Sequence, residues 1–206
     1  MSDDRFFEWV EYMNWFDSHC HLKGFKNKGN LEEILWRAEE NGVSRMTAVG
    51  TSNDDWEIYK NLSEQYRDKI FYSVGLHPCY VNEGYESVIE KIESYLGSGS
   101  PPVAIGEIGL DYFHLPKNHN EALSIIKNQK IAFLEQLKIA AHYNLPTIVH
   151  SRNAFSDCIA IIEQSGLPWE KILFHCFSEG VEEIKELNDR GGYASFTGII
   201  TFKNNE

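Results

Sequence analysis

Hydrophobic and polar positions follow two alternating patterns along this chain. Short apolar runs, typical of buried strands, are followed by stretches in which apolar residues recur every three or four positions, as on one face of a helix. Strands are therefore expected at 13–17, 45–50, 70–75, 103–108, 146–150, 171–177 and 192–200. Helices are expected at 31–41, from 53 or 54 onward, and at 85–96, 120–143, 153–164 and 181–189.

Strand and helix patterns in alternation predict a parallel α/β sheet. A doubly wound open sheet and a closed barrel both fit this order of elements. The polar residues at the ends of several strands favour the barrel, because a barrel brings the carboxyl ends of its strands to one axis. We therefore expect a TIM-type (β/α) barrel of one domain over residues 1–206. The sequence ends soon after the seventh run, so we expect the eighth strand and the last helices to be lacking, with residues 1–13 as a short N-terminal extension.

One carboxylate lies inside an expected strand. Glu107 stands among apolar neighbours at 103–108, and the nearest basic residues along the chain, Lys91 and Lys117, lie outside this strand and its turns. Burying an unpaired carboxylate costs several kcal/mol, so Glu107 needs a positive partner.

Histidines at the ends of other strands could bind a metal cation, and that cation would be the positive partner of Glu107. His19 and His21 are two positions apart and face the same way on a strand, while His150 and His175 end two later strands. Any one of them alone is more often a core histidine with satisfied hydrogen bonds. Their shared position at the carboxyl ends of parallel strands favours metal binding, with Asp17 as a supporting partner of the ligands.

The proposed ligands exceed what a single tetrahedral ion with an open position needs. They suit two divalent cations about 3.5–4 Å apart that share one bridging carboxylate, which must be Glu107. Such a pair activates water and polarises a P–O or C=O group, which is the chemistry of hydrolysis. Imidazole and carboxylate ligands suit Mg²⁺, Mn²⁺ and Zn²⁺ alike.

The composition limits which molecules the chain can bind and where in the cell it is expected. The chain has 19 Lys and Arg against 31 Asp and Glu, a formal charge of −12, so any contact with nucleic acid should be local rather than a broad basic face. The four cysteines form no CxxC pair and are expected to be free thiols in a reducing compartment. No signal peptide or membrane span is evident, so we expect a cytoplasmic protein.

Five motifs carry a resemblance to a known family. They are Phe16-Asp17-Ser18-His19-Cys20-His21-Leu22, Gly75-Leu76-His77-Pro78, Gly106-Glu107-Ile108-Gly109-Leu110-Asp111-Tyr112, Val149-His150-Ser151-Arg152 and Phe174-His175-Cys176-Phe177-Ser178. Their order, and the tail 193–198, resembles the TatD family of metal-dependent hydrolases and deoxyribonucleases. The match covers roughly residues 14–203.

The resemblance implies a metallo-dependent-hydrolase barrel that cleaves phosphodiester bonds of DNA. It implies that His19 and His21 bind one cation, that His150 and His175 bind the other, and that Glu107 bridges them. His77 would lie near the reacting phosphate as a catalytic and substrate-binding residue. The family also has an aspartate ligand in a Glu-Thr-Asp motif after strand eight, and the 206-residue sequence contains no such motif.

Several alternatives remain open. Arg152 can hold a phosphate with its guanidinium fork or pair with a neighbouring acid. His77 can donate to a phosphate or stabilise its loop. At the level of the whole protein, the alternatives to a deoxyribonuclease are a metal-dependent hydrolase of a small phosphoester or amide, and an inactive truncated barrel. No protein partner and no membrane association are expected.

Overall fold

The computed structural model describes residues 14–202 and contains seven parallel strands in sequential order. The strands are β1 Trp15–Cys20, β2 Val43–Ala48, β3 Ile70–Val74, β4 Ala104–Asp111, β5 Thr147–Arg152, β6 Ile172–Phe174 and β7 Tyr193–Ala194. The expected N-terminal extension, residues 1–13, lies outside the described residues.

Helices follow the strands. The α-helices are α2 Lys23–Lys28, α3 Leu31–Glu40, α4 Asn53–Gln65, α5 Glu86–Ile89, α6 Ile92–Leu96, α7 His119–His142, α8 Phe155–Ser165 and α9 Val181–Arg190. The 3₁₀ helices are η2 Pro78–Tyr80, η3 Trp169–Lys171 and η4 Gly198–Thr201. Within residues 14–202, no helix combines the length and the apolar content needed to cross a bilayer.

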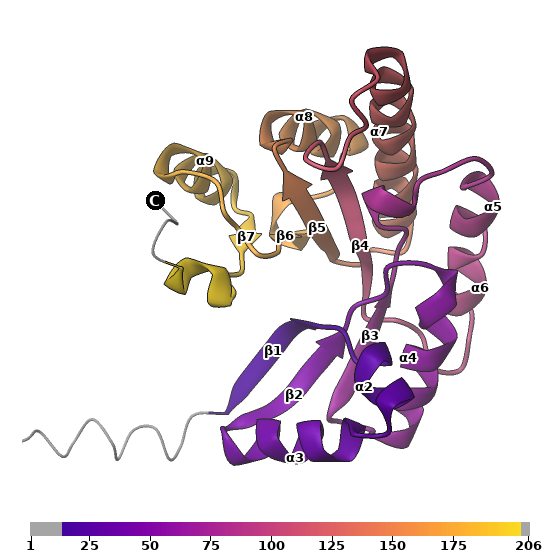
Figure 1. Ribbon diagram of the computed structural model, residues 1–206, viewed down its shortest axis with the longest axis vertical. Coiled ribbons are helices and arrows are strands. Elements are labelled where there is room, and N and C mark those ends of the chain that lie inside the picture. The colour runs from indigo at the N-terminus through magenta and orange to yellow at the C-terminus, as the bar shows by residue number, and fades with distance from the viewer. Residues whose placement is uncertain (1–13, 203–206) are drawn as a thin grey trace, which may run out of the picture.

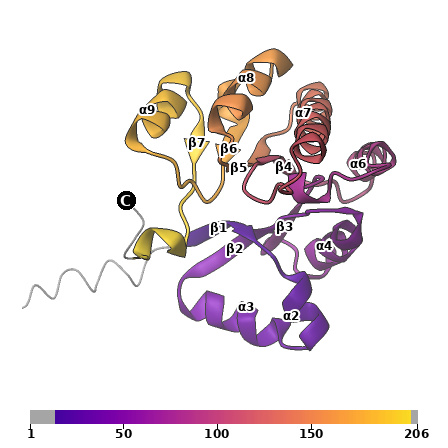
Figure 2. The ribbon, with the colours of Figure 1, turned by 45° about the horizontal axis from the view of Figure 1, so that its top comes forward.

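The sheet curls into most of a barrel, with the helices on its outer side (Figures 1 and 2). Its strands are neighbours in chain order from β1 to β7, which is the order of a (β/α) barrel and not of a doubly wound sheet. In the part of the chain that the structure describes, β1 and β7 are the two edge strands. The prediction of a TIM-type barrel lacking one strand is confirmed.

The expected strand at 192–200 is wrong in its extent. Only Tyr193 and Ala194 pair with β6, and the ladder ends after Ser195, whose backbone bonds to Phe174 and Phe177. The Thr197 hydroxyl then accepts a hydrogen bond from the Ile199 N–H and begins η4. A local side-chain cap therefore redirects an apolar run that reads as a strand in isolation.

The expected helix at 85–96 is divided into α5 and α6. At the break, the Lys91 N–H bonds to the Val88 carbonyl and the Ser94 N–H to the Lys91 carbonyl, at 3.2 and 3.1 Å. These bonds span three residues instead of four, so the chain makes a 3₁₀ turn between two α-helical turns.

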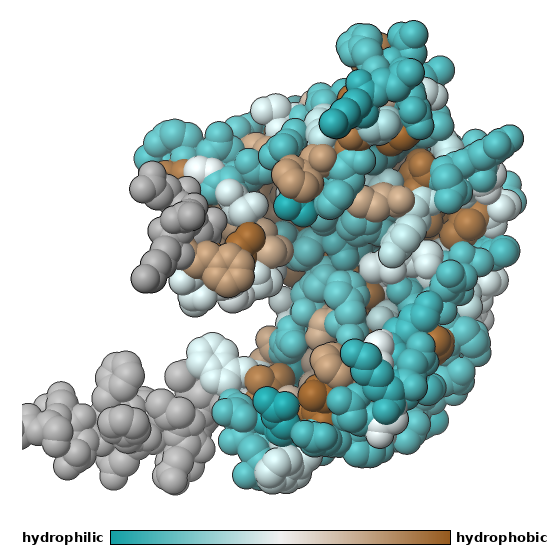
Figure 3. Space-filling view, viewed as in Figure 1, coloured by the Kyte–Doolittle hydropathy of each residue, from teal (hydrophilic) through white to brown (hydrophobic). Residues whose placement is uncertain are grey.

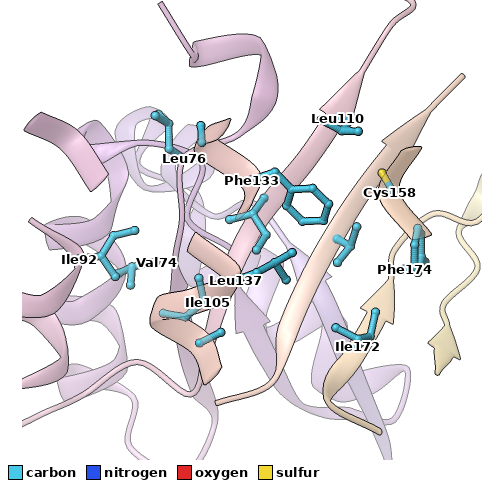
Figure 4. Close-up of a cluster of buried hydrophobic side chains, with 14 of the residues drawn as sticks. Val74, Leu76, Ile92, Ile105, Leu110, Phe133, Leu137, Cys158, Ile172 and Phe174 are labelled. Carbon is cyan, nitrogen blue, oxygen red and sulfur yellow. The ribbon is translucent and has the colours of Figure 1, made fainter. Parts of the chain in front are cut away.

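The hydrophobic core lies between the sheet and the helices of its outer side. Side chains of β3, β4 and β6 pack against α7 and α8 in the close-up of Figure 4. The labelled members are Val74, Leu76, Ile92, Ile105, Leu110, Phe133, Leu137, Cys158, Ile172 and Phe174, all at most 2% exposed. This core fixes the strands whose ends carry the candidate ligands.

Helix α7 also holds the backbone near the carboxyl ends of β3 and β4 through two buried amides. The Gln136 side chain accepts from the Leu76 N–H at 2.7 Å and donates to the Leu76 carbonyl at 3.2 Å. About two turns earlier on the same face of α7, the Gln129 side chain accepts from the Asp111 N–H at 3.0 Å and donates to the carbonyls of Asp111 and Pro78 at 3.3 Å. We call these two side chains the glutamine clamps.

The margin between the two edge strands is apolar. The space-filling view shows a recess between the part that carries β1 and the part that carries β7 (Figure 3). Large hydrophobic side chains at least 46% exposed come from β1 and from the segment after β7, namely Trp15, Phe16, Phe196, Ile200 and Phe202.

We predict that Gln136→Leu lowers the free energy of unfolding by about 2–4 kcal/mol, because the buried N–H and carbonyl of Leu76 lose their partner. Gln164→Leu on α8, where the side chain is exposed, should change it by less than about 0.5 kcal/mol. Urea denaturation measures both. Equal stability of the two variants would show that this clamp contributes nothing.

Candidate metal centre

The predicted histidine ligands lie at the carboxyl ends of strands, and Glu107 lies in the middle of β4. His19 is on β1 and His21 directly follows it, Glu107 is on β4 and His150 on β5, and His175 follows β6. The curl of the sheet turns these ends toward one another, so residues far apart in the sequence become neighbours.

Glu107 is aimed into this site by a local irregularity of β4. The pairing of β4 with β5 shifts in register between Gly106 and Ile108, and a bulge of this kind redirects a side chain. The Glu107 backbone N–H bonds to the Gly50 carbonyl at 2.6 Å, which ties the residue to the end of β2. The side chain is 3% exposed.

One oxygen of Glu107 faces the histidines of the first strand. The distances from Oε2 are 3.3 Å to Nε2 of His19 and 3.8 Å to Nε2 of His21. The two imidazole nitrogens lie 3.2 Å from each other. These three residues form a group whose ligand atoms are within 4.8 Å of one another.

The other oxygen of Glu107 faces the histidines of the later strands. Oε1 lies 2.7 Å from Nε2 of His175, 3.0 Å from Nδ1 of His150 and 3.3 Å from Nε2 of His77. The facing nitrogens of His150 and His175 are 3.3 Å apart. The two carboxylate oxygens thus divide the imidazoles into two sets.

The electrostatics of the site depend on these contacts. Among residues 14–202, Glu107 has no Lys or Arg partner. Burial raises the pKa of Glu107, but the hydrogen bonds from His150, His175, His19 and His77 outweigh burial and hold it well below its ordinary value. Burial likewise opposes protonation of His150, yet its hydrogen bonds to Asp111 and Glu107 raise the pKa of His150 to about 9.

The spacing of the nitrogens fits cation ligands. Two imidazole nitrogens bound to one tetrahedral ion at the usual bond length are about 3.3 Å apart. The pairs here, His19 with His21 and His150 with His175, stand at 3.2 and 3.3 Å. The spacing of these nitrogens therefore fits the ligands of a divalent cation.

Hydrogen bonds on the far side of three of the five rings indicate which nitrogen can bind a cation, whereas Nδ1 of His19 and Nδ1 of His175 are buried without a hydrogen-bond partner among residues 14–202. Nδ1 of His21 faces the Val49 carbonyl, so it carries its proton there and Nε2 turns a free lone pair toward Glu107. His150 has a carboxylate on each side, Asp111 at Nε2 and Glu107 at Nδ1, so it donates to both, and a cation bound at Nδ1 would displace the proton on that nitrogen. His77 is the opposite case to His21, because its Nδ1 accepts from the Cys79 N–H at 3.1 Å and its Nε2 must carry the proton. His77 therefore presents a donor and not a ligand atom.

The other two predicted residues lie at the edge of the site. The Arg152 side chain is exposed, and its guanidinium stacks over the Phe113 ring at 3.9 Å from the centroid. Within the described residues it has no carboxylate partner in an ion pair. The Asp17 carboxylate accepts the backbone N–H of His19 at 3.0 Å, so it supports the ligand through the main chain and not through the imidazole.

Sequence reasoning missed a second cluster beside the centre. Asp111, 1% exposed, receives contacts from His150, His114 and the Cys79 thiol at 3.0, 2.9 and 3.6 Å. Burial and the Asp111 carboxylate raise the pKa of the Cys79 thiol to about 11. The sequence does contain a signal for this cluster, since Glu107 and Asp111 are four residues apart and therefore lie on the same face of one strand.

Comparison with protein families finds one match over most of the chain. Residues 16–206 match the family described as TatD related DNase. The uncharacterized metal-dependent hydrolase YcfH of Escherichia coli K12 is 33% identical over 193 residues, covering 92% of this chain and 69% of YcfH. The deoxyribonuclease Tat-D of Schizosaccharomyces pombe is 33% identical over 184 residues, covering 84% of this chain and 56% of that protein.

A solved structure shares the fold. The TatD homolog YjjV of Escherichia coli K12 superposes with a TM-score of 0.80 at 27% identity, covering 92% of this chain and 70% of YjjV. The sequence and structural matches agree with one another.

We predict that Zn²⁺ or Mn²⁺ at about 100 times its dissociation constant raises the Tm by about 5 °C or more, because a cation that binds only the folded state stabilises it by about 2.7 kcal/mol. Glu107→Gln should lose most of this shift, since it removes the charge shared by both imidazole sets. Glu182→Gln, with a side chain 82% exposed, is the matched control and should keep the shift. Differential scanning calorimetry with and without EDTA measures it, and an undiminished shift in Glu107→Gln contradicts the assignment.

Proposed function

This chain belongs to the TatD family of metal-dependent hydrolases, and we propose that it hydrolyses phosphodiester bonds of DNA with two divalent cations. The observation that carries the proposal is the division of the imidazoles between the two oxygens of Glu107. The names of two relatives support the substrate, namely the deoxyribonuclease Tat-D of S. pombe and the 3'-5' ssDNA/RNA exonuclease TatD of Pantoea ananatis.

In this proposal Glu107 and four histidines would hold the cations. His19 and His21 face Oε2 of Glu107, and His150 and His175 face Oε1, so each pair would supply the ligands of one cation and Glu107 would serve both. The chemistry that such a pair supplies is activation of water and stabilisation of charge on the phosphoryl oxygens. A carboxylate 3% exposed keeps this charge arrangement away from bulk water, where it would be screened.

His77 positions the scissile phosphate. Its Nε2–H points into the site, 3.3 Å from Oε1 of Glu107, and the bond from the Cys79 N–H to its Nδ1 fixes this tautomer. A donor with this orientation can bond to a non-bridging phosphate oxygen as negative charge builds up on it. Its side chain is 14% exposed, so substrate can reach it.

Arg152 binds the nucleic-acid backbone outside the reacting group. Its guanidinium is exposed at the end of β5, and stacking on Phe113 limits the orientations that it adopts. A guanidinium fork held in this way matches two oxygens of a phosphate.

Next to His21, a cleft of about 640 Å³ bordered by Lys23, Asn27 and Tyr80 offers room for an adjoining nucleotide.

A second candidate follows from the charge of the chain. A formal charge of −12 repels a long polyanion and favours a small substrate, such as a phosphodiester or an amide of low charge. The catalytic residues would be the same. Turnover of a panel of small phosphodiesters and amides, compared with single-stranded and nicked DNA, separates the two candidates.

We predict that DNA hydrolysis requires added Mg²⁺, Mn²⁺ or Zn²⁺ and stops with EDTA. Glu107→Gln should lower kcat/KM by about 1,000-fold or more, because it removes the ligand common to both positions. Glu182→Gln should retain the activity of the unaltered chain. Measured release of nucleotides from labelled DNA tests this, and metal-independent cleavage would refute the proposal.

We predict that Arg152→Ala raises KM for DNA roughly 10-fold while kcat changes by less than about 3-fold, because a phosphate contact outside the reacting group contributes equally before and during the reaction. Arg152→Lys should recover only part of the loss, since an ammonium lacks the two-pronged geometry. Steady-state kinetics of the two variants decide the point. A fall in kcat with unchanged KM would place Arg152 in the chemical step instead.

A further inference from the structure

We propose that Cys79, Asp111 and His114 form a third cation site, which binds a zinc-like divalent cation through a thiolate, a carboxylate and an imidazole. Cys79 lies in η2, Asp111 ends β4 and His114 lies in the turn that follows. The structure groups their ligand atoms within 4.8 Å of one another. The site is distinct from the two positions around Glu107 and does not depend on the proposed nuclease activity.

The distances among the three ligand atoms are close to those of a tetrahedral face. Sγ of Cys79 lies 3.6 Å from Oδ2 of Asp111 and 3.8 Å from Nδ1 of His114, and the last two atoms are 2.9 Å apart. The usual Zn–S, Zn–N and Zn–O bond lengths give about 3.6, 3.6 and 3.4 Å for these same pairs. Cation binding therefore requires each of these three interatomic distances to change by about half an ångström or less.

Asp111 is held in place for this role. Its Oδ1 accepts the backbone N–H groups of Phe113 and His114, both at 3.0 Å. Its Oδ2 accepts from Nε2 of His150 at 3.0 Å, and a carboxylate oxygen has a second lone pair for a cation. The side chain is 1% exposed, so its orientation is fixed before any cation arrives.

The other two ligands give access from solvent. Cys79 is exposed and the His114 side chain is 54% exposed, so a cation can enter and keep one position for water or substrate. Binding forms bonds to Sγ, Nδ1 and Oδ2, releases the thiol proton to solvent and leaves the imidazole proton on Nε2 of His114. A thiolate ligand selects Zn²⁺ or Co²⁺ over Mg²⁺.

The test is titration of the metal-free 206-residue chain with Co²⁺, followed by absorption spectroscopy. We expect a thiolate-to-cobalt charge-transfer band in the near ultraviolet and a total of three ions per chain. Cys79→Ser should lose the band and one equivalent while keeping the other two. His114→Gln should keep the band but weaken that equivalent by about 10-fold or more.

Cys176→Ser is the matched control, because Cys176 is another free, partly exposed thiol and its Sγ contacts Thr197 instead of the cluster. It should keep both the band and the stoichiometry. Alkylation provides a measurement that needs no variant, since Zn²⁺ but not Mg²⁺ should slow the reaction of Cys79 with iodoacetamide, as followed by peptide mass spectrometry, and EDTA should restore it.

Three results overturn the proposal. Binding of two Co²⁺ ions without a charge-transfer band removes the third site and leaves the centre around Glu107 intact. A band that persists in Cys79→Ser assigns the thiolate to another cysteine. Failure of the chain to bind any Co²⁺ removes this site and the proposed hydrolytic centre together, so the failures of the two proposals are distinguishable.

Discussion

The burial of the Glu107 carboxylate is the constraint on which the rest of this structure depends. A carboxylate 3% exposed and without a Lys or Arg partner in residues 14–202 is stable only if other groups compensate its charge. The compensating imidazoles come from the ends of β1, β3, β5 and β6, so they reach one point only because the sheet curls. Burial of the Glu107 charge therefore depends on the curl of the sheet, because only the curl brings the compensating imidazoles to it.

Much of the fold was predictable because alternating hydrophobic patterns report burial directly. The strands that carry the histidines and Glu107 were found from such patterns, and their shared position at strand ends indicated that they would meet. The end of the sheet was not predictable in this way. The run at 192–200 is apolar, but its conformation depends on the Thr197 cap and on where pairing with β6 stops. Asp111 was missed because β4 continues to it through pairing with β5, which lies far away in the sequence.

The protein distinguishes its histidines by the atoms behind them. A carbonyl on the far side of the ring leaves a lone pair facing Glu107 in His21, whereas a backbone N–H leaves a proton there in His77. His150 lies between Asp111 and Glu107 and donates to both carboxylates. Identical side chains at similar distances from one carboxylate are thereby suited to different tasks. The main chain and Asp111 set this division, so it cannot be read from the histidines alone.

The glutamine clamps imply that the face that carries the candidate ligands and the outer helix layer open as one unit. The amides of Leu76 and Asp111 are protected by side chains of α7 and not by a neighbouring strand. Their exchange with solvent deuterium therefore requires α7 to lift from the sheet, a sub-global opening instead of a local loop fluctuation. Packing changes on the far face of α7, remote from every histidine in the centre, would in this way alter how long the site stays assembled.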